Sequence, residues 1–201
     1  MMSRRRAVAT AAVLLMPLGT LASCAQDTGL GHMNGTSQRA IGPAMPGSMH
    51  DSIPASESDY LSTMVAHHTE AVAAARQLVR SDRSAMRALG RSIVASQTAQ
   101  IEQMRAWQAR WYPDAPASSY EPMMRDLTAL SGDALDRTFL IDMVPHHMSA
   151  VMMSHFLLTR GLADHPAVSG LAAGIAQEQS REIRTMLRWS RSWFGLGRSM
   201  R

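Results

Sequence analysis

"FLIDMVPHHMSAV", residues 139–151, reads as one helical stretch and occurs twice in the chain in related form. "YLSTMVAHHTEAV", residues 60–72, repeats its leucine, its Met-Val step, its paired histidines and its closing Ala-Val step. A second pair of stretches, "IVASQTAQIEQMRAWQARWY" (93–112) and "IAQEQSREIRTMLRWSRSWF" (175–194), aligns in the same order, and the offsets are 79 and 82 residues. The repeat predicts two copies of one helical hairpin, packed about an approximate twofold axis.

The chain from Ser56 onward predicts four long helices. We expect them at about 57–80, 83–112, 133–160 and 166–194, with a short helical turn near 120–129. Pro166 at the first position of the last helix and Gly195 just past its end are typical helix boundaries. No segment alternates with a period of two residues, so no sheet is expected. The predicted fold class is all-α, a four-helix bundle over 57–194 with a C-terminal tail at 195–201.

Residues 1–23 have the pattern of an export signal peptide. Arg4, Arg5 and Arg6 precede an apolar run, and residues 21–24 read Leu-Ala-Ser-Cys. This ending looks like the lipobox of bacterial lipoproteins, in which the cysteine is acylated, so we expect lipidation at Cys24. The arginines fit both a twin-arginine signal and the ordinary export route. The protein is then expected to be lipid-anchored at the outer face of the cytoplasmic membrane or in the periplasm or cell envelope.

Residues 24–56 predict a flexible, disordered linker that tethers the bundle. Glycines 29, 31, 35, 42 and 47 and prolines 43, 46 and 54 leave no periodic apolar face. The segment also carries scattered histidines and methionines. They are either polar filler or a loose metal-scavenging arm, and composition does not choose between the two.

Charge and cysteine content exclude several classes of protein. All 20 basic residues are arginines, and removing the three in the signal leaves 17 against 16 acidic residues. A mature net charge near +1 gives no support for nucleic-acid binding, although the whole chain has a pI near 10.2. Cys24 is the only cysteine, so disulfides, CxxC redox chemistry and thiolate metal sites are excluded.

The paired histidines carry the strongest chemical signal. Each helical residue advances about 100°, which places a methionine and the two histidines that follow it in one wedge of each copy. If the copies face each other, four imidazoles and two thioethers meet near the middle of the bundle. Thioethers favour Cu(I), whereas four imidazoles could also hold zinc, which stays open. No Glu-x-x-His occurs, so a di-iron site is not expected. The candidate ligands are Met64, His67, His68, Met143, His146 and His147.

A second stripe lies beside these residues on the third helix only. Met148, Met152 and His155 follow each other at i, i+4 and i+7, and they are either further ligands or adaptable packing. Adjacent histidines diverge by about 100°, so one member of each pair could instead form a supporting hydrogen bond. The partners expected for such a bond are Gln97, Gln179 and Glu178.

The two "HH" stretches together with the pattern Q-x3-I-x2-M-x2-W resemble the domain of unknown function 305 family over about residues 56–194. Proteins of this family are exported bacterial proteins with a ferritin-like four-helix fold, and some are associated with copper binding and tolerance. The resemblance implies that fold and a copper site here. The first copy departs from the pattern because Ala66 stands where the second copy has Pro145. The resemblance ranks Met143, His146, His147 and Met148 first as metal ligands, followed by Met64, His67 and His68.

Three functions follow as hypotheses. The first is an extracytoplasmic lipoprotein that sequesters Cu(I) or transfers it to a partner protein. The second is a metal-dependent oxidoreductase, for which Glu70, Asp142 and Glu178 are the nearby acids. The third is a structural helical module without bound metal. Gly170 and Gly174 would let another helix approach closely, within the monomer or in a homodimer.

Overall fold

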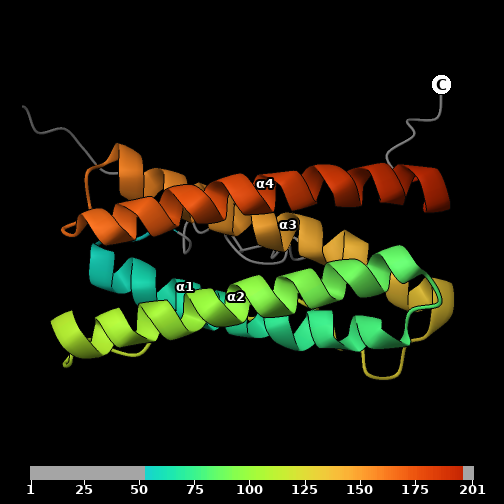
Figure 1. Ribbon diagram of the computed structural model, residues 1–201, viewed down its shortest axis with the longest axis horizontal. Coiled ribbons are helices and arrows are strands. Elements are labelled where there is room, and N and C mark those ends of the chain that lie inside the picture. The colour runs from blue at the N-terminus through green and yellow to red at the C-terminus, as the bar shows by residue number, and fades with distance from the viewer. Residues whose placement is uncertain (1–52, 197–201) are drawn as a thin grey trace, which may run out of the picture. The chain divides into compact units, whose positions relative to one another are not determined.

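The structure, a computed structural model, describes residues 53–196, which fold into four long helices and one short 3₁₀ helix. No strand occurs in this range. α1 packs on α2, α3 packs on α4, and the two hairpins meet along α1 and α3 (Figure 1). The predicted all-α bundle of two helical hairpins is confirmed. The elements are α1 (Glu57–Arg76), η2 (Gln77–Arg80), α2 (Ser84–Trp111), α3 (Gly132–Thr159) and α4 (Pro166–Phe194).

The predicted signal peptide, Cys24 and nearly all of the predicted linker lie outside the described residues, as do the last five residues of the chain. Of the helices within 53–196, none combines the length and the apolar composition that a membrane span requires.

Most helix boundaries follow from the local sequence. Ser56 caps α1, since its hydroxyl accepts the Asp59 N–H at 3.1 Å. Pro166 begins α4, and Gly195 ends it with a φ of 65°, in the left-handed region that favours glycine. α3 continues without a break through Pro145.

The helical turn predicted near 120–129 is wrong, because these residues form an irregular segment. Their backbone N–H groups bind side chains instead of helical carbonyls: Met123 and Met124 donate to Glu70, and Arg125 donates to Asp142. The first helix also ends earlier than expected, at Arg76, and the chain then tightens into η2.

The apolar core consists of two clusters that are copies of each other. One contains Tyr60, Leu61 and Met64 of α1, and the other contains their repeat equivalents Phe139, Leu140 and Met143 of α3. Of the ten buried members of the first cluster, nine have their equivalent in the second at the offsets of 79 and 82. The tenth is Ala172, whose equivalent is Gly90, so the internal twofold extends to individual core positions.

Each end of the bundle is closed by a buried carboxylate that joins the two hairpins. At one end Glu57 of α1, fully buried, accepts hydrogen bonds from the His165 backbone N–H (2.8 Å) and side chain (2.7 Å) at the start of α4. The His165 ring stacks on Trp111 of α2 at 3.7 Å between centroids.

The other end repeats this arrangement at the equivalent positions. Asp136 of α3, also fully buried, pairs with Arg83 at the start of α2 (2.9 Å), and the Arg83 guanidinium lies 4.9 Å from the Trp193 ring centroid. Both contacts cross between hairpins, so they fix the register of one hairpin against the other.

Gly90 provides a test of hairpin packing. A Cβ at this position would lie 2.7 Å from the Ala75 carbonyl oxygen and 2.9 Å from the Leu78 Cβ. We therefore expect Gly90→Ala to lower the free energy of unfolding by about 1–3 kcal/mol, because α2 must move away from α1. Gly174→Ala on α4 is the control, since a Cβ there meets nothing within 4 Å and alanine should stabilise the helix by up to about 1 kcal/mol. Urea denaturation measures both, and equal midpoints for the two variants would contradict the packing.

Candidate metal centre

Four histidine rings form a continuous row between the two apolar clusters. We call His68, His67, His146 and His147 the histidine row. The His67 and His146 rings are in contact, with centroids 3.6 Å apart and planes tilted by 34°. The outer rings follow at 6.0 Å (His68 from His67) and 6.2 Å (His147 from His146). All four side chains are fully buried. The row lies near the internal twofold, since it joins the equivalent positions of α1 and α3.

Each ring of the row uses one nitrogen and leaves the other free. The four Nε2 atoms lie at 2.7–3.1 Å from acceptor oxygens. The four Nδ1 atoms are buried and have no hydrogen-bond partner. His67 faces the His146 backbone carbonyl, and His68 faces Gln100 Oε1. His146 faces Glu70 Oε2, and His147 faces Glu182 Oε2.

The acceptors determine which nitrogen carries the proton. The backbone carbonyl and the carboxylates of Glu70 and Glu182 in their ionised form accept hydrogen bonds, so their histidines donate through Nε2–H. Gln100 gives its amide N–H to Glu178 at 3.0 Å, so its carbonyl faces His68 and also accepts. With its proton on Nε2, a neutral imidazole carries its lone pair on Nδ1, the nitrogen that is buried without a partner in all four rings. This is the arrangement of metal-binding histidines, whose second nitrogen is held by an acceptor.

Two glutamines extend the buried polar layer. Gln97 of α2 and Gln179 of α4 occupy equivalent repeat positions and are each 2% exposed. Three of their four amide atoms are buried without a partner: Gln97 Oε1 and both polar atoms of Gln179. Buried polar atoms without partners cost about 1–3 kcal/mol each. A layer with this many of them does not serve packing, and native proteins usually explain such atoms by a bound ion or water.

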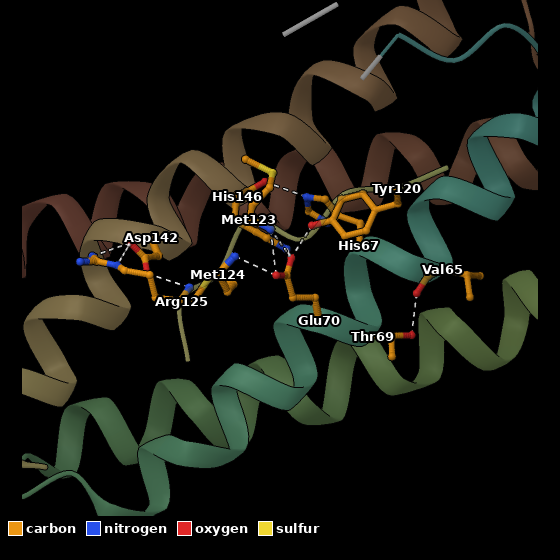
Figure 2. A network of polar contacts seen from close by, with 10 residues as sticks. All are labelled: Val65, His67, Thr69, Glu70, Tyr120, Met123, Met124, Arg125, Asp142 and His146. Carbon is orange, nitrogen blue, oxygen red and sulfur yellow. Dashed lines mark hydrogen bonds and ion pairs between the residues drawn. The ribbon is translucent and has the colours of Figure 1, made fainter. Parts of the chain in front are cut away.

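Glu70 connects His146 to the segment that crosses from α2 to α3. Its carboxylate accepts the His146 Nε2–H at 3.1 Å, the Tyr120 hydroxyl, and the backbone N–H groups of Met123 (2.9 Å) and Met124 (2.7 Å). Figure 2 shows these groups gathered around the carboxylate, with His67 beside Tyr120. The Tyr120 ring meets His67 edge-on, with centroids 5.5 Å apart.

Burial keeps three rings of the histidine row neutral, those of His67, His68 and His147. It lowers the pKa of His68 to about 3, against the hydrogen bond to Gln100, and it lowers the pKa of His67 well below the usual value with help from the neighbouring His146. Burial and the proximity of His146 lower the pKa of His147 to about 3.

The two carboxylates beside the row differ. Burial raises the pKa of Glu182 to about 7, so it can hold a proton near neutrality next to His147. Burial also raises the pKa of Glu70, but hydrogen bonds outweigh this effect and lower the pKa to about 2. The donors of these bonds are His146, Tyr120, Met124 and Met123. Glu70 is therefore a fixed negative charge.

The other predicted site residues separate into buried and exposed groups. Met64 and Met143 are fully buried, each one turn before a histidine pair on the same helix face. Met152 is partly buried. Met148 is 54% exposed and His155 is also exposed, so neither lies in the buried layer with the histidine row.

The sequence-based choice of hydrogen-bond partners was wrong in part. The histidines bind Gln100 and Glu182, not Gln97 or Gln179, and Glu178 contacts the row only through Gln100. Gln100 and Glu182 are 82 residues apart, so they occupy equivalent positions of the two hairpins. The repeat therefore contained the information needed to find them as a pair. Tyr120 could not be found this way, because the segment that holds it occurs once. Asp142 forms an ion pair with Arg125 at 2.6 Å and has no contact with the row.

The family model described as "Domain of unknown function (DUF305)" matches residues 24–108 and 57–190. The chain belongs to the DUF305 family. A search of the curated proteins finds no match. Among solved structures, CopM in the Cu(I)-bound form is 30% identical, with a TM-score of 0.62, covering 70% of this chain and 99% of that one. CopM in the Cu(II)-bound form is 28% identical, with a TM-score of 0.63 and coverage of 71% and 100%. A DUF305 protein from Streptomyces coelicolor, described as secreted, is 26% identical, with a TM-score of 0.57 and coverage of 65% and 90%.

The buried layer contains imidazole nitrogens, and Met64 and Met143 are buried thioethers. Within residues 53–196, no three His, Cys, Asp or Glu side chains converge closely enough to hold one ion. A zinc site with three or four such ligands is therefore not preformed in this arrangement. A histidine nitrogen combined with a buried thioether needs no such cluster, and thioethers select soft ions.

The pH dependence of stability tests the buried neutral histidines. The unfolded chain binds protons at His67 and His68 near pH 6.5, whereas the folded chain does not, so stability should fall as pH drops below 6.5. Each of the two contributes about 1.4 kcal/mol per pH unit. Between pH 7 and about pH 4.5, the loss of stability caused by His147 is offset, because Glu182 takes up a proton in the folded state. Below that pH, the lowered pKa of Glu70 causes a further loss of stability. Denaturation of the metal-free protein between pH 7 and 4 measures this, and a flat profile would contradict neutral burial.

Proposed function

We propose that this protein is an extracytoplasmic copper-binding lipoprotein that sequesters Cu(I) or transfers it through histidine and methionine ligands. One observation carries the proposal: four fully buried Nδ1 atoms lack partners, while the Nε2 of each ring is already held by an acceptor. The ligands would be drawn from the histidine row, Met64 and Met143, with at most two histidines to one ion in the arrangement described. The copper- and silver-bound forms of CopM support the choice of a soft ion in this fold.

Ligand pre-orientation explains how the site would bind. A hydrogen bond from Nε2 to a carboxylate or carbonyl fixes the ring and makes Nδ1 a better donor. Because burial already keeps His67, His68 and His147 neutral, the ion displaces no proton from these three rings, and thioethers have none to lose. Full burial of the four rings limits the access of bulk water to the ligands. The ion is the cargo of the site.

Export and anchoring complete the proposal. The pattern Leu-Ala-Ser-Cys at 21–24 would place a lipid on Cys24, and residues 24–56 would serve as a tether. The secreted DUF305 protein from Streptomyces coelicolor supports export. The release of Cu(I) to a partner protein fits a site on the outer side of a membrane.

Histidine substitutions test the site. His146→Ala/His147→Ala should weaken Cu(I) affinity about 100-fold or more, because it removes two of the four free Nδ1 donors. His67→Ala/His68→Ala should have a similar effect. His155→Ala is the matched control, since this exposed histidine of α3 lies outside the buried layer. Competition with a chelator of known affinity gives the constants, and circular dichroism checks folding. An equal loss in the control would place copper elsewhere.

Methionine substitutions test the kind of metal. Met64→Leu/Met143→Leu keeps the core volume but removes both thioethers, so Cu(I) affinity should fall at least about tenfold while zinc affinity stays the same. The same competition assay compares the two ions. Loss of binding in the histidine variants with no effect of the methionines would favour Cu(II) or zinc.

The anchor has its own test. Cys24→Ser should prevent acylation, so the protein should move from the membrane fraction to the soluble fraction of the envelope. Labelling with a radioactive fatty acid and fractionation of cells check this. A protein that stays in the membrane fraction with serine at position 24 would contradict lipid anchoring.

A further inference from the structure

The histidine row is closed to solvent, so an ion reaches it only if something moves. All four rings are fully buried. On one side, hydrogen bonds of Gln100 and Glu182 from α2 and α4 cover the two outer rings. On the other side, the two inner rings, His67 and His146, lie next to Tyr120 and Glu70. The second side is covered partly by chain that belongs to no helix.

We call residues 118–125 the strap. It is fixed at both ends and in the middle. Ser118 donates to Thr63 of α1 at 3.3 Å, and the Arg125 side chain binds Asp142 of α3 through two nitrogens, at 2.9 Å and 2.6 Å. Between these points, Tyr120, Met123 and Met124 each donate a hydrogen bond to Glu70, as Figure 2 shows. The strap has no helical hydrogen bonds of its own, and most of its side chains are exposed.

Within residues 53–196, Glu70 is the only side chain outside the strap that forms hydrogen bonds with both the strap and the row. The same carboxylate oxygen, Oε2, accepts from Tyr120 and from His146 Nε2. The repeat equivalent of Glu70 is Ser149, and no second irregular segment of this kind hydrogen-bonds to the row in the part of the chain that the structure describes. The layer therefore departs from twofold symmetry on one side, where the strap lies next to the touching rings of His67 and His146.

We propose that Glu70 is a latch that holds the strap over His67 and His146, and that opening of the strap is the route by which Cu(I) enters and leaves. This rests on the proposed function. When the strap lifts, Glu70 loses the bonds to Tyr120, Met123 and Met124 and keeps the bond to His146. The inner rings then face solvent, while the outer rings remain held between α2 and α4. Local opening of this kind breaks few apolar contacts and needs no separation of the hairpins.

Glu70→Gln tests the latch. The variant removes the charge from all four hydrogen bonds, and charge-assisted bonds are the stronger ones. Cu(I) transfer from the loaded protein to excess bicinchoninate should become about tenfold faster, and Cu(I) uptake by the metal-free protein should accelerate by a similar factor. Stopped-flow absorbance measures both rates. Hydrogen exchange of the Met123 and Met124 amides should also speed up, and this readout needs no copper.

Glu57→Gln is the matched control. It alters a carboxylate of the same helix that also accepts several hydrogen bonds, but at the end of the bundle, about 20 Å along α1 from Glu70. It should leave both copper rates and the exchange of the strap amides unchanged. If Glu57→Gln accelerates transfer equally, general loosening of the bundle explains the effect and the latch is wrong.

The outcomes separate this inference from the proposed function. Faster release in Glu70→Gln with unchanged uptake would mean that Glu70 only positions His146, which overturns the gate. Unchanged rates in both directions would also overturn it, even with normal copper binding. Tyr120→Phe, which keeps the ring over His67 but removes one bond to Glu70, should accelerate both rates less than Glu70→Gln. A wild-type protein that binds no Cu(I) would instead refute the proposed function.

Discussion

The structure depends on the burial of four imidazoles in the middle of the bundle. Their Nε2 atoms are hydrogen-bonded to acceptors, and their Nδ1 atoms have no hydrogen-bond partner among residues 53–196. Leucine at these positions would join the two apolar clusters into one core at lower free energy. The surrounding apolar clusters and the carboxylate contacts at both ends compensate for this cost. They keep the helices in register, so the polar layer does not have to hold the bundle together.

Duplication explains much of the layer. Equivalent residues of the two hairpins supply the histidines, the methionines and the buried glutamines, and also the partner pair of Gln100 and Glu182. The two hairpins differ in the acceptors that hold their inner histidines. His146 binds Glu70, whereas His67 binds a backbone carbonyl, because the segment between the hairpins can cross only one side of the axis. A symmetric core thereby gains an asymmetric cover.

The repeat made most of the fold predictable. Helix ranges, helix ends and the pairing of hairpins follow from apolar periodicity and from the two offsets. The same offsets put the four histidines and two methionines on equivalent inward faces. The segment 118–125 was not predictable, because its conformation is set by Glu70 and Asp142, which are distant in sequence. The exposure of Met148 and His155 was also missed, since a stripe spaced at i, i+4 and i+7 does not reveal which side of the helix meets another helix.

The direct measurement for the central claim is long-range ¹H–¹⁵N correlation of histidine-labelled protein titrated with Ag(I), a non-redox substitute for Cu(I). The account predicts that the Nδ1 resonances of the histidine row shift on binding, while their Nε2 atoms stay protonated. Coordination through Nε2, or shifts confined to histidines outside the row, would contradict it.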